Sequence, residues 1–184
     1  WCLTQFATAK MGAIMVCINP AYRTYELEYA MNKVECSTLI TAESFKTSDY
    51  LGMLAELAPE LENSEAGGLN SERLPHLRNV IAMGEQVNSG MFRFADVCDM
   101  GGAAEALRLE ALQGELQPDD AINIQFTSGT TGHPKGATLS HNNILNNGRM
   151  CGENMLFTEK DRLCIPVPLY HCFGMVLGNL TCAA

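Results

Sequence analysis

The sequence predicts an α/β fold, in which a layered sheet is covered by flanking helices. Helical and extended patterns alternate along the N-terminal third of the chain, which is the usual order in such folds. The short stretch at residues 13–18 is wholly apolar, as expected for a strand that is buried on both faces of a parallel sheet. The chain has 184 residues, of which 47% are hydrophobic, and can therefore form one sizeable core.

Apolar spacing and turn residues place the elements of the first part. Gly12 is predicted to end the first helix, and Thr24 is predicted to cap the second. Residues 60–74 contain glycines, asparagines and charges, and are predicted to form an exposed loop or a variable insertion. The other predicted elements here are helices at residues 3–11, 25–34 and 50–57, and strands at residues 13–18, 37–41 and 78–83.

The second part is predicted to continue the same alternation. Residues 136–139 follow the apolar strand at residues 122–126 closely enough to pair with it as a hairpin. Ser140 is a candidate N-cap for the helix after this hairpin. The remaining predicted elements are a short irregular element at residues 91–99, helices at 101–113 and 141–154, a strand at 163–167 and a helix from Phe173 onward. No composition shift marks a second domain.

Charge and cysteine content limit the class of function. The chain has 12 basic and 21 acidic residues, a formal charge of −9, and no basic cluster, which argues against nucleic acid as a partner. Its eight cysteines include no CxxC pair and no zinc spacing. They are predicted to be small buried hydrophobes in a reducing compartment.

Residues 163–184 contain no Asp, Glu, Lys or Arg, which raises the question of a membrane span. Two prolines, a histidine and an asparagine in this stretch would need internal partners within lipid. A buried strand, a turn and a buried helix explain the pattern better. We therefore expect no transmembrane segment.

The residues after the strand at 122–126 are rich in hydroxyls and glycines, and a lysine follows them. The run reads Thr127-Ser128-Gly129-Thr130-Thr131-Gly132-His133-Pro134-Lys135-Gly136. Small residues allow backbone N–H groups to approach a ligand, and the hydroxyls and lysine add donors and positive charge. A polar surface turn would have a similar composition, but the order of these residues favours a loop that binds a polyphosphate. The spacing is not that of the Walker loop, because Lys135 is followed by Gly136.

This run resembles the nucleotide-binding signature of the adenylate-forming superfamily, which includes acyl-CoA synthetases, luciferases and peptide-synthetase adenylation domains. The resemblance implies that the loop binds ATP with Mg²⁺, and that coenzyme A is a co-substrate. It implies that Lys135 is catalytic and that Thr130 is the candidate contact to Mg²⁺ through the nucleotide. The implied nucleotide contacts are Thr127, Ser128, Gly129, Thr130, Thr131, Gly132, His133, Pro134 and Lys135.

A second segment, Pro168-Leu169-Tyr170-His171-Cys172-Phe173-Gly174, resembles the part of the same superfamily that lines the acyl-substrate pocket. The resemblance implies that His171 orients the substrate carboxylate, and that Phe173 and Gly174 shape the pocket. A histidine in an apolar run is more often a satisfied core residue. The phosphate loop upstream favours the functional interpretation.

The wider resemblance is to mitochondrial medium-chain acyl-CoA synthetases, and it covers nearly all of the chain. It implies that residues 1–184 are part of the large N-terminal domain, truncated at both ends and without the small C-terminal domain. We therefore expect a mitochondrial ligase of medium-chain fatty acids as the parent and no activity from the 184 residues alone. The alternatives are an aryl-acid CoA ligase or peptide-synthetase-type adenylation domain, and a non-catalytic nucleotide-binding module.

Overall fold

The computed structural model of the chain describes residues 1–86, 88–127 and 134–184. The chain forms two compact units, which composition alone did not mark. The first unit combines Trp1–Asn19 with Glu105–Ala184, and the second consists of Pro20–Ala104. Each unit contains helices and a small sheet with parallel strand pairs, as the α/β prediction requires.

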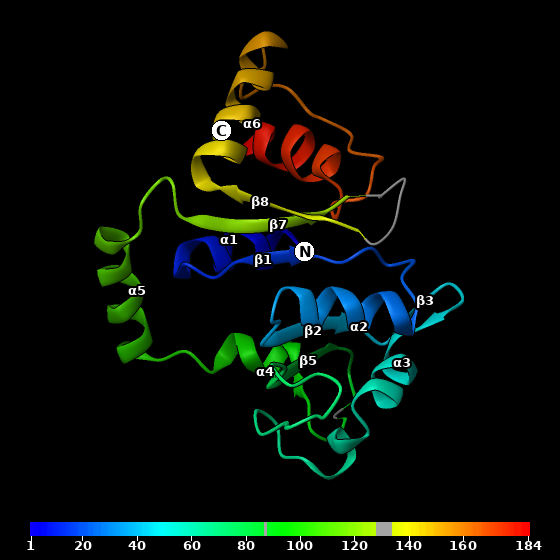
Figure 1. The fold of residues 1–184 in the computed structure, drawn as a ribbon. Coiled ribbons are helices and arrows are strands. Elements are labelled where there is room, and N and C mark those ends of the chain that lie inside the picture. The colour runs from blue at the N-terminus through cyan, green and yellow to red at the C-terminus, as the bar shows by residue number, and fades with distance from the viewer. Residues whose placement is uncertain (87, 128–133) are drawn as a thin grey trace. The chain divides into compact units, whose positions relative to one another are not determined.

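The first unit is built around a three-stranded sheet in the order β1-β7-β8. β1 runs parallel to β7, and β8 returns antiparallel to β7 as the predicted hairpin. Figure 1 shows helices α6 and η2 side by side next to this hairpin. The elements of this unit are α1 (Cys2–Met11), β1 (Met15–Cys17), α5 (Ala103–Glu115), β7 (Ala121–Phe126), β8 (Gly136–Ser140), α6 (His141–Asn154), η2 (Phe173–Leu180) and α7 (Thr181–Ala183).

Local chemistry explains two boundaries in this unit that were predicted correctly. Gly12 ends α1 with a φ of 74°, a left-handed conformation that glycine adopts without a steric penalty. Ser140 caps α6, because its hydroxyl accepts the N–H of Asn143 while the Asn143 side chain accepts the N–H of Ser140. The cap sets where the β7–β8 hairpin passes into α6.

The core of the first unit joins its sheet to two of its helices. Buried side chains from β1, β7, α6 and η2 form one apolar cluster: Cys17, Ile122, Ile144, Met175, Val176 and Leu180. The regular i, i+5 hydrogen bonding of η2 makes it a π-helix, which is wider than an α-helix. Burying these side chains fixes η2 against the sheet.

The second unit contains a parallel sheet in the order β2-β5-β6 and a separate two-stranded hairpin of β3 and β4. Helix α3 contacts both α2 and β2. The elements are α2 (Thr24–Lys33), β2 (Thr38–Ala42), β3 (Ser44–Phe45), β4 (Ser48–Asp49), α3 (Tyr50–Leu57), the 3₁₀ helix η1 (Pro59–Asn63), β5 (Asn79–Met83), β6 (Phe92–Arg93) and α4 (Phe94–Asp99).

Residues 60–74, predicted to form an exposed loop or a variable insertion, expose most of their side chains, but the prediction missed a short 3₁₀ helix and several buried leucines. Leu61, Leu69 and Leu74 are buried, and Leu69 is only 1% exposed. These leucines join Leu54 and Leu57 of α3 in the apolar interior of the second unit. The prediction rested on the charges and glycines of this segment. Its widely spaced leucines were the feature that indicated burial.

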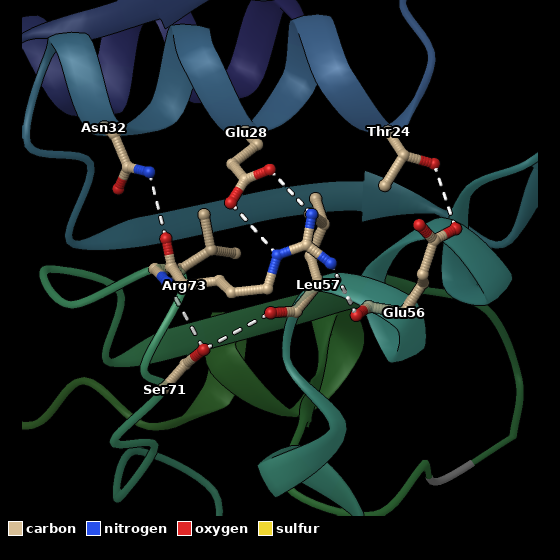
Figure 2. A network of polar contacts seen from close by, with 8 residues as sticks. Thr24, Glu28, Asn32, Glu56, Leu57, Ser71 and Arg73 are labelled. Atoms are coloured by element: carbon tan, nitrogen blue, oxygen red, sulfur yellow. Dashed lines mark hydrogen bonds and ion pairs between the residues drawn. The ribbon is translucent and has the colours of Figure 1, made fainter.

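A polar network holds the same segment against α2 and α3 (Figure 2). The guanidinium group of Arg73 donates two hydrogen bonds to the Glu28 carboxylate, at 3.0 and 2.7 Å, and one to the Glu56 carbonyl oxygen at 3.3 Å. Asn32 donates to the carbonyl oxygen of Arg73 at 2.9 Å. Ser71 donates to the Leu57 carbonyl oxygen at 3.4 Å. The leucines and this network together explain why the segment is ordered.

Three further predictions were wrong in detail. Arg23, not Thr24, is the N-cap of α2, and its N–H donates to Glu26. Residues 163–167 are not assigned as a strand, because no neighbouring strand pairs with them in the described part of the chain. All eight cysteines are free thiols, but only Cys17 is buried.

The described residues contain no helix with both the length and the apolar character needed to cross a membrane. The uncharged stretch at residues 163–184 instead contains an extended segment, a turn at Pro168–His171, and the helices η2 and α7.

The burial of Leu69 predicts a large effect on stability. Leu69→Ala is expected to lower the free energy of unfolding by about 3 kcal/mol, because the change leaves a cavity in the second unit. Urea denaturation of the 184-residue chain measures the change. The control Leu107→Ala alters a side chain that is 68% exposed and should shift stability by less than about 0.5 kcal/mol. Equal effects of the two variants would contradict the assignment of Leu69 to the core.

The ion pair between Arg73 and Glu28 predicts a pH-dependent effect. Hydrogen bonds from Arg73 hold the pKa of the Glu28 carboxyl below its usual range. This contribution to stability is fully present above the unfolded-state pKa of about 4.3, and it is lost as the pH falls through the lower folded-state pKa. Arg73→Met is therefore expected to lower the thermal midpoint at pH 7, by an amount that shrinks in acid.

Differential scanning calorimetry between pH 3 and pH 7 measures this difference. Arg108→Met is the control, because it breaks an exposed ion pair with Glu115 inside the single helix α5. It should change the midpoint less than Arg73→Met does. An Arg73→Met effect that stays constant down to pH 3 would contradict the role given to Glu28.

Candidate nucleotide and acid site

The predicted phosphate loop begins where β7 ends and finishes where β8 begins. Phe126 and Gly136 are the last paired residues of the hairpin, and the N–H of Thr127 donates to the Lys135 carbonyl oxygen at 2.9 Å. The side chains of Thr127 and Lys135 are exposed. The base of the loop is therefore closed by backbone bonding, with one hydroxyl and one ammonium group open to a ligand.

Six of the predicted nucleotide contacts lie outside the described residues: Ser128, Gly129, Thr130, Thr131, Gly132 and His133. Of the other three, Thr127 and Lys135 are exposed and Pro134 is partly buried. A Cβ atom on Gly136 would lie 3.0 Å from the Cγ2 atom of Ile124, so glycine permits the tight pairing at the loop base. The described residues thus fix the two ends of the loop.

Two amide side chains on β7, just before the loop, were not among the residues predicted from the sequence. Asn123 is 2% exposed, and its Nδ2 donates to the Met15 carbonyl oxygen at 3.1 Å and contacts the Cys17 sulfur at 3.6 Å. Gln125 donates to the Asn123 Oδ1 atom at 3.0 Å. Two amides at alternate positions of an otherwise apolar strand were the available signal, because such residues share one face.

These amides connect the loop to η2. The Gln125 Nε2 atom lies 3.6 Å from the sulfur of Met175, which is buried in the core. Gln125 is two residues before Thr127, and Met175 is four residues after His171. The structure therefore brings the end of β7 against the first turn of η2, which follows the predicted carboxylate-binding segment. Burial also raises the pKa of the Cys17 thiol beside this pair, so Cys17 stays uncharged.

His171 lies in a turn that several backbone bonds hold in place. Its N–H donates to the Pro168 carbonyl oxygen at 3.2 Å, and its own carbonyl oxygen accepts the N–H of Met175 at 3.0 Å. The N–H of Phe173 donates to Nδ1 of the His171 ring at 3.2 Å. Because Nδ1 accepts, a neutral ring carries its proton on Nε2. The exposed His171 side chain can thus offer an N–H donor to a carboxylate oxygen.

Phe173 and Gly174, the other predicted pocket residues, directly follow this turn and begin η2. Gly174 is buried, and a Cβ atom there would lie 2.8 Å from the Pro168 carbonyl carbon and 3.0 Å from the Val167 carbonyl oxygen. The Phe173 ring is 53% exposed although it is large and apolar. Gly174 therefore permits the turn, and Phe173 offers an open apolar surface next to His171.

The described residues contain no group of three or more His, Cys, Asp or Glu side chains that could hold a metal ion. A Mg²⁺ ion bound here would keep its water and phosphate ligands, as this ion does in many nucleotide sites. The hydroxyl and ammonium groups at the loop base suit the phosphates of such a complex. The donors in the described part thus fit a nucleotide better than a free metal ion.

Comparisons with known proteins identify the family of the chain. A family profile described as AMP-binding enzyme matches residues 1–184. The chain is 48% identical over 185 residues to the medium-chain acyl-CoA ligase ACSF2, mitochondrial, of Danio rerio, covering 100% of this chain and 30% of that protein. It is 41% identical over 184 residues to the acyl-CoA synthetase YngI of Bacillus subtilis, covering 100% and 34%. The chain therefore spans about a third of the length of these relatives.

Two solved structures share the fold. The anthranilate CoA ligase AuaEII, in complex with anthranoyl-AMP, has a TM-score of 0.74 and 24% identity over 97% of this chain and 30% of that chain. MbtA of Mycobacterium smegmatis has a TM-score of 0.73 and 20% identity over 98% and 29%. Both similarities confirm the predicted fold class.

The tight turn at Gly174 predicts that adding one methyl group there lowers the stability of the chain. Gly174→Ala is expected to lower the free energy of unfolding by about 1–3 kcal/mol, because the new Cβ collides with the backbone at Pro168. The control Gly114→Ala adds the same group in α5, where no atom lies within 4 Å, and should stabilise the chain by about 0.5–1 kcal/mol. Urea denaturation compares the two. A neutral Gly174→Ala would contradict the tight turn.

Proposed function

Because the chain belongs to the AMP-binding enzyme family, as its motifs predicted, we propose that it is the nucleotide-binding segment of an acid–CoA ligase. The observation that carries the proposal is the link from the loop base at Thr127 and Lys135 through Gln125 and Met175 to the His171 turn. Relatives named acyl-CoA ligase or synthetase support the choice of reaction. Since the chain spans 30% of the first of these, the activity is assigned to a full-length ligase that carries this segment.

The proposed reaction has two steps. The acid carboxylate attacks the α-phosphate of ATP, which releases pyrophosphate and leaves an acyl-adenylate, and coenzyme A then replaces AMP to give a thioester. In the first step the loop has to hold the charge of the leaving pyrophosphate. The ammonium group of Lys135 and the Thr127 hydroxyl are the described donors for that task.

The loop residues outside the described part of the chain belong to the same proposal. Ser128 through His133 supply backbone N–H groups and hydroxyls to the phosphates, and Thr130 is the proposed contact to Mg²⁺ through the nucleotide. When bound, the metal ion neutralises phosphate charge during the displacement.

His171 is proposed to orient the acid. Its Nδ1 atom is occupied by the N–H of Phe173, so its Nε2–H is free to donate to one carboxylate oxygen. A carboxylate held this way keeps its other oxygen available for attack on the α-phosphate. Phe173 and Gly174 then border the space into which the rest of the acid extends.

The proposed acid is a medium-chain fatty acid, which is the substrate class in the name of the Danio rerio relative. A mitochondrial location is part of the proposal and rests only on the name of the Danio rerio relative. The Bacillus subtilis relative gives it no support, because it is a bacterial protein. We further propose that residues 1–184 are one part of a larger N-terminal domain.

Lys135→Ala tests the role of the loop. In a full-length ligase carrying this segment, it is expected to lower kcat/KM for octanoyl thioester formation by about 100- to 1000-fold, because one charge-stabilising donor is lost. Release of pyrophosphate and formation of thioester are both measured. The matched control is Lys160→Ala, an exposed lysine outside the loop, which should leave the rate unchanged.

The same assay decides between the proposal and its alternatives. Preference for octanoate over benzoate and over amino acids supports a fatty-acid ligase, whereas preference for either of the others assigns the chain to an aryl-acid ligase or an adenylation domain. A wild-type protein that binds ATP but releases no pyrophosphate with any acid would be a nucleotide-binding module instead.

A further inference from the structure

The Gln125 side chain contacts both β7 and η2, close to where the phosphate loop begins. Its Nε2 atom donates to Oδ1 of Asn123 at 3.0 Å and lies 3.6 Å from the sulfur of Met175. An amide nitrogen carries two hydrogens, so this one atom can serve both acceptors. Gln125 therefore has a defined orientation, with one contact in its own strand and one in η2.

The strand end of this contact is fixed by a buried hydrogen bond. Asn123 is 2% exposed, and its Nδ2 atom donates to the Met15 carbonyl oxygen of β1 at 3.1 Å. An Asn123 side chain that turned away would leave a buried donor unpaired, which is costly. The pair of strands β1 and β7 thus sets the position from which Gln125 reaches η2.

The helix end of the contact is also buried, and it is bonded to the His171 turn. Met175 is 0% exposed, and its N–H donates to the His171 carbonyl oxygen at 3.0 Å. A thioether sulfur is a weak acceptor, so its bond to Gln125 gives direction more than stability. The position of the Met175 sulfur relative to β7 therefore determines where the His171 turn lies.

The two contacting residues are close in the chain to the two halves of the candidate site. Gln125 is two residues before Thr127, and Met175 is four residues after His171. In the proposed reaction, the carboxylate oxygen has to approach the α-phosphate to about 3–3.5 Å, and an error of about 1 Å can lower the rate about 100-fold. A weak contact between β7 and η2 can therefore have a large effect on the rate.

A second amide contact holds the other end of η2. Asn179 donates to Oε1 of Gln5 in α1 at 2.6 Å, and Gln5 is 5% exposed. This contact lies near the C-terminal end of η2, eight residues after His171. The Gln125 contact is the one that lies beside the His171 turn.

We propose that Gln125 is a positioning residue, which sets the phosphate loop and the His171 turn at the distance needed for attack of the carboxylate on the α-phosphate. This role rests on the proposed ligase function and belongs to a residue outside both motifs. Gln125 contacts neither substrate, and it acts through Met175 and through the strand that leads into the loop. Its role is limited to formation of the acyl-adenylate, because transfer to coenzyme A starts from an adenylate in which the acid and AMP are already joined.

Met175→Leu and Gln125→Leu in a full-length ligase carrying this segment test this role. Each variant is expected to slow pyrophosphate release from ATP and octanoate about tenfold, because the two halves of the site lose their fixed distance. Each should form thioester from synthetic octanoyl-AMP and coenzyme A within about twofold of the wild-type rate. Rapid-quench kinetics measures the two half-reactions separately. Met175→Leu is the milder change, because it conserves side-chain volume and leaves the bond between Gln125 and Asn123 intact.

The double variant and a matched control separate positioning from a general loss of structure. Gln125→Leu combined with Met175→Leu should slow pyrophosphate release no further than Gln125→Leu alone, because both changes remove the same contact. The control is Gln5→Leu, which removes the amide contact at the other end of η2. It should keep the wild-type ratio of the two half-reaction rates, even if it lowers the thermal midpoint.

The outcomes separate this role from the proposed function. A wild-type ligase that performs both half-reactions, with a Met175→Leu variant that keeps the wild-type ratio, would overturn the positioning role and leave the ligase function standing. Equal slowing of both half-reactions, or a Gln5→Leu variant that shifts the ratio as far, would also overturn it, because either result indicates a structural effect. A wild-type protein that performs neither half-reaction would contradict the ligase function, and the role of Gln125 with it.

Discussion

The buried amide of Asn123 is the constraint on which the first unit depends. An amide in a core has to find partners for its donor and acceptor groups, and leaving one unpaired costs about 1–3 kcal/mol. Asn123 meets this requirement with the Met15 carbonyl oxygen of β1 and the Gln125 side chain of its own strand. Gln125 in turn contacts Met175 of η2. These contacts select one arrangement of β1, β7 and η2, and so set where the loop and the His171 turn begin.

The same constraint explains how the candidate site residues can be exposed and still be held in fixed positions. Thr127 directly follows β7, and Lys135 directly precedes β8, which pairs with β7. His171 precedes η2, whose Met175 and Val176 are core residues. Each exposed group is therefore attached within a few residues to buried structure. Sites supported in this way hold their geometry better than sites in long free loops.

Local chemistry made part of the fold predictable from sequence. Gly12, Ser140 and the β7–β8 hairpin were predicted correctly because each depends on residues that are adjacent in the chain. The burial of Leu61, Leu69 and Leu74 was not, because it depends on distant parts of the chain, such as α2 and α3, to which Arg73 ties the segment. The lack of a pairing partner for residues 163–167 in the described part of the chain could not be predicted either, since a strand forms only where another strand is available to pair.

The candidate site was predictable to a similar extent and for the same reason. Contiguous motifs made Lys135 and His171 candidates, and the match of the whole chain to one family confirmed the resemblance that the motifs carried. The link between them through Gln125 and Met175 joins residues 50 positions apart in the chain, and it is visible only once β7 and η2 pack together. An apolar groove between the end of α6, residues 163–167 and η2 also becomes visible only in the fold, because its lining comes from three separate segments.

In the proposed function, the phosphate loop and the region that contacts the acid have different effects on the reaction. In the proposed reaction the phosphates of ATP are the same for every acid, so the contacts proposed for Lys135 and its loop should raise the rate for all acids alike. Discrimination among acids has to come from contacts with the part that differs, which is the hydrocarbon chain. Burying one CH₂ group contributes about 0.8 kcal/mol, or about fourfold in rate or affinity. Selectivity for chain length therefore accumulates one carbon at a time along an apolar surface.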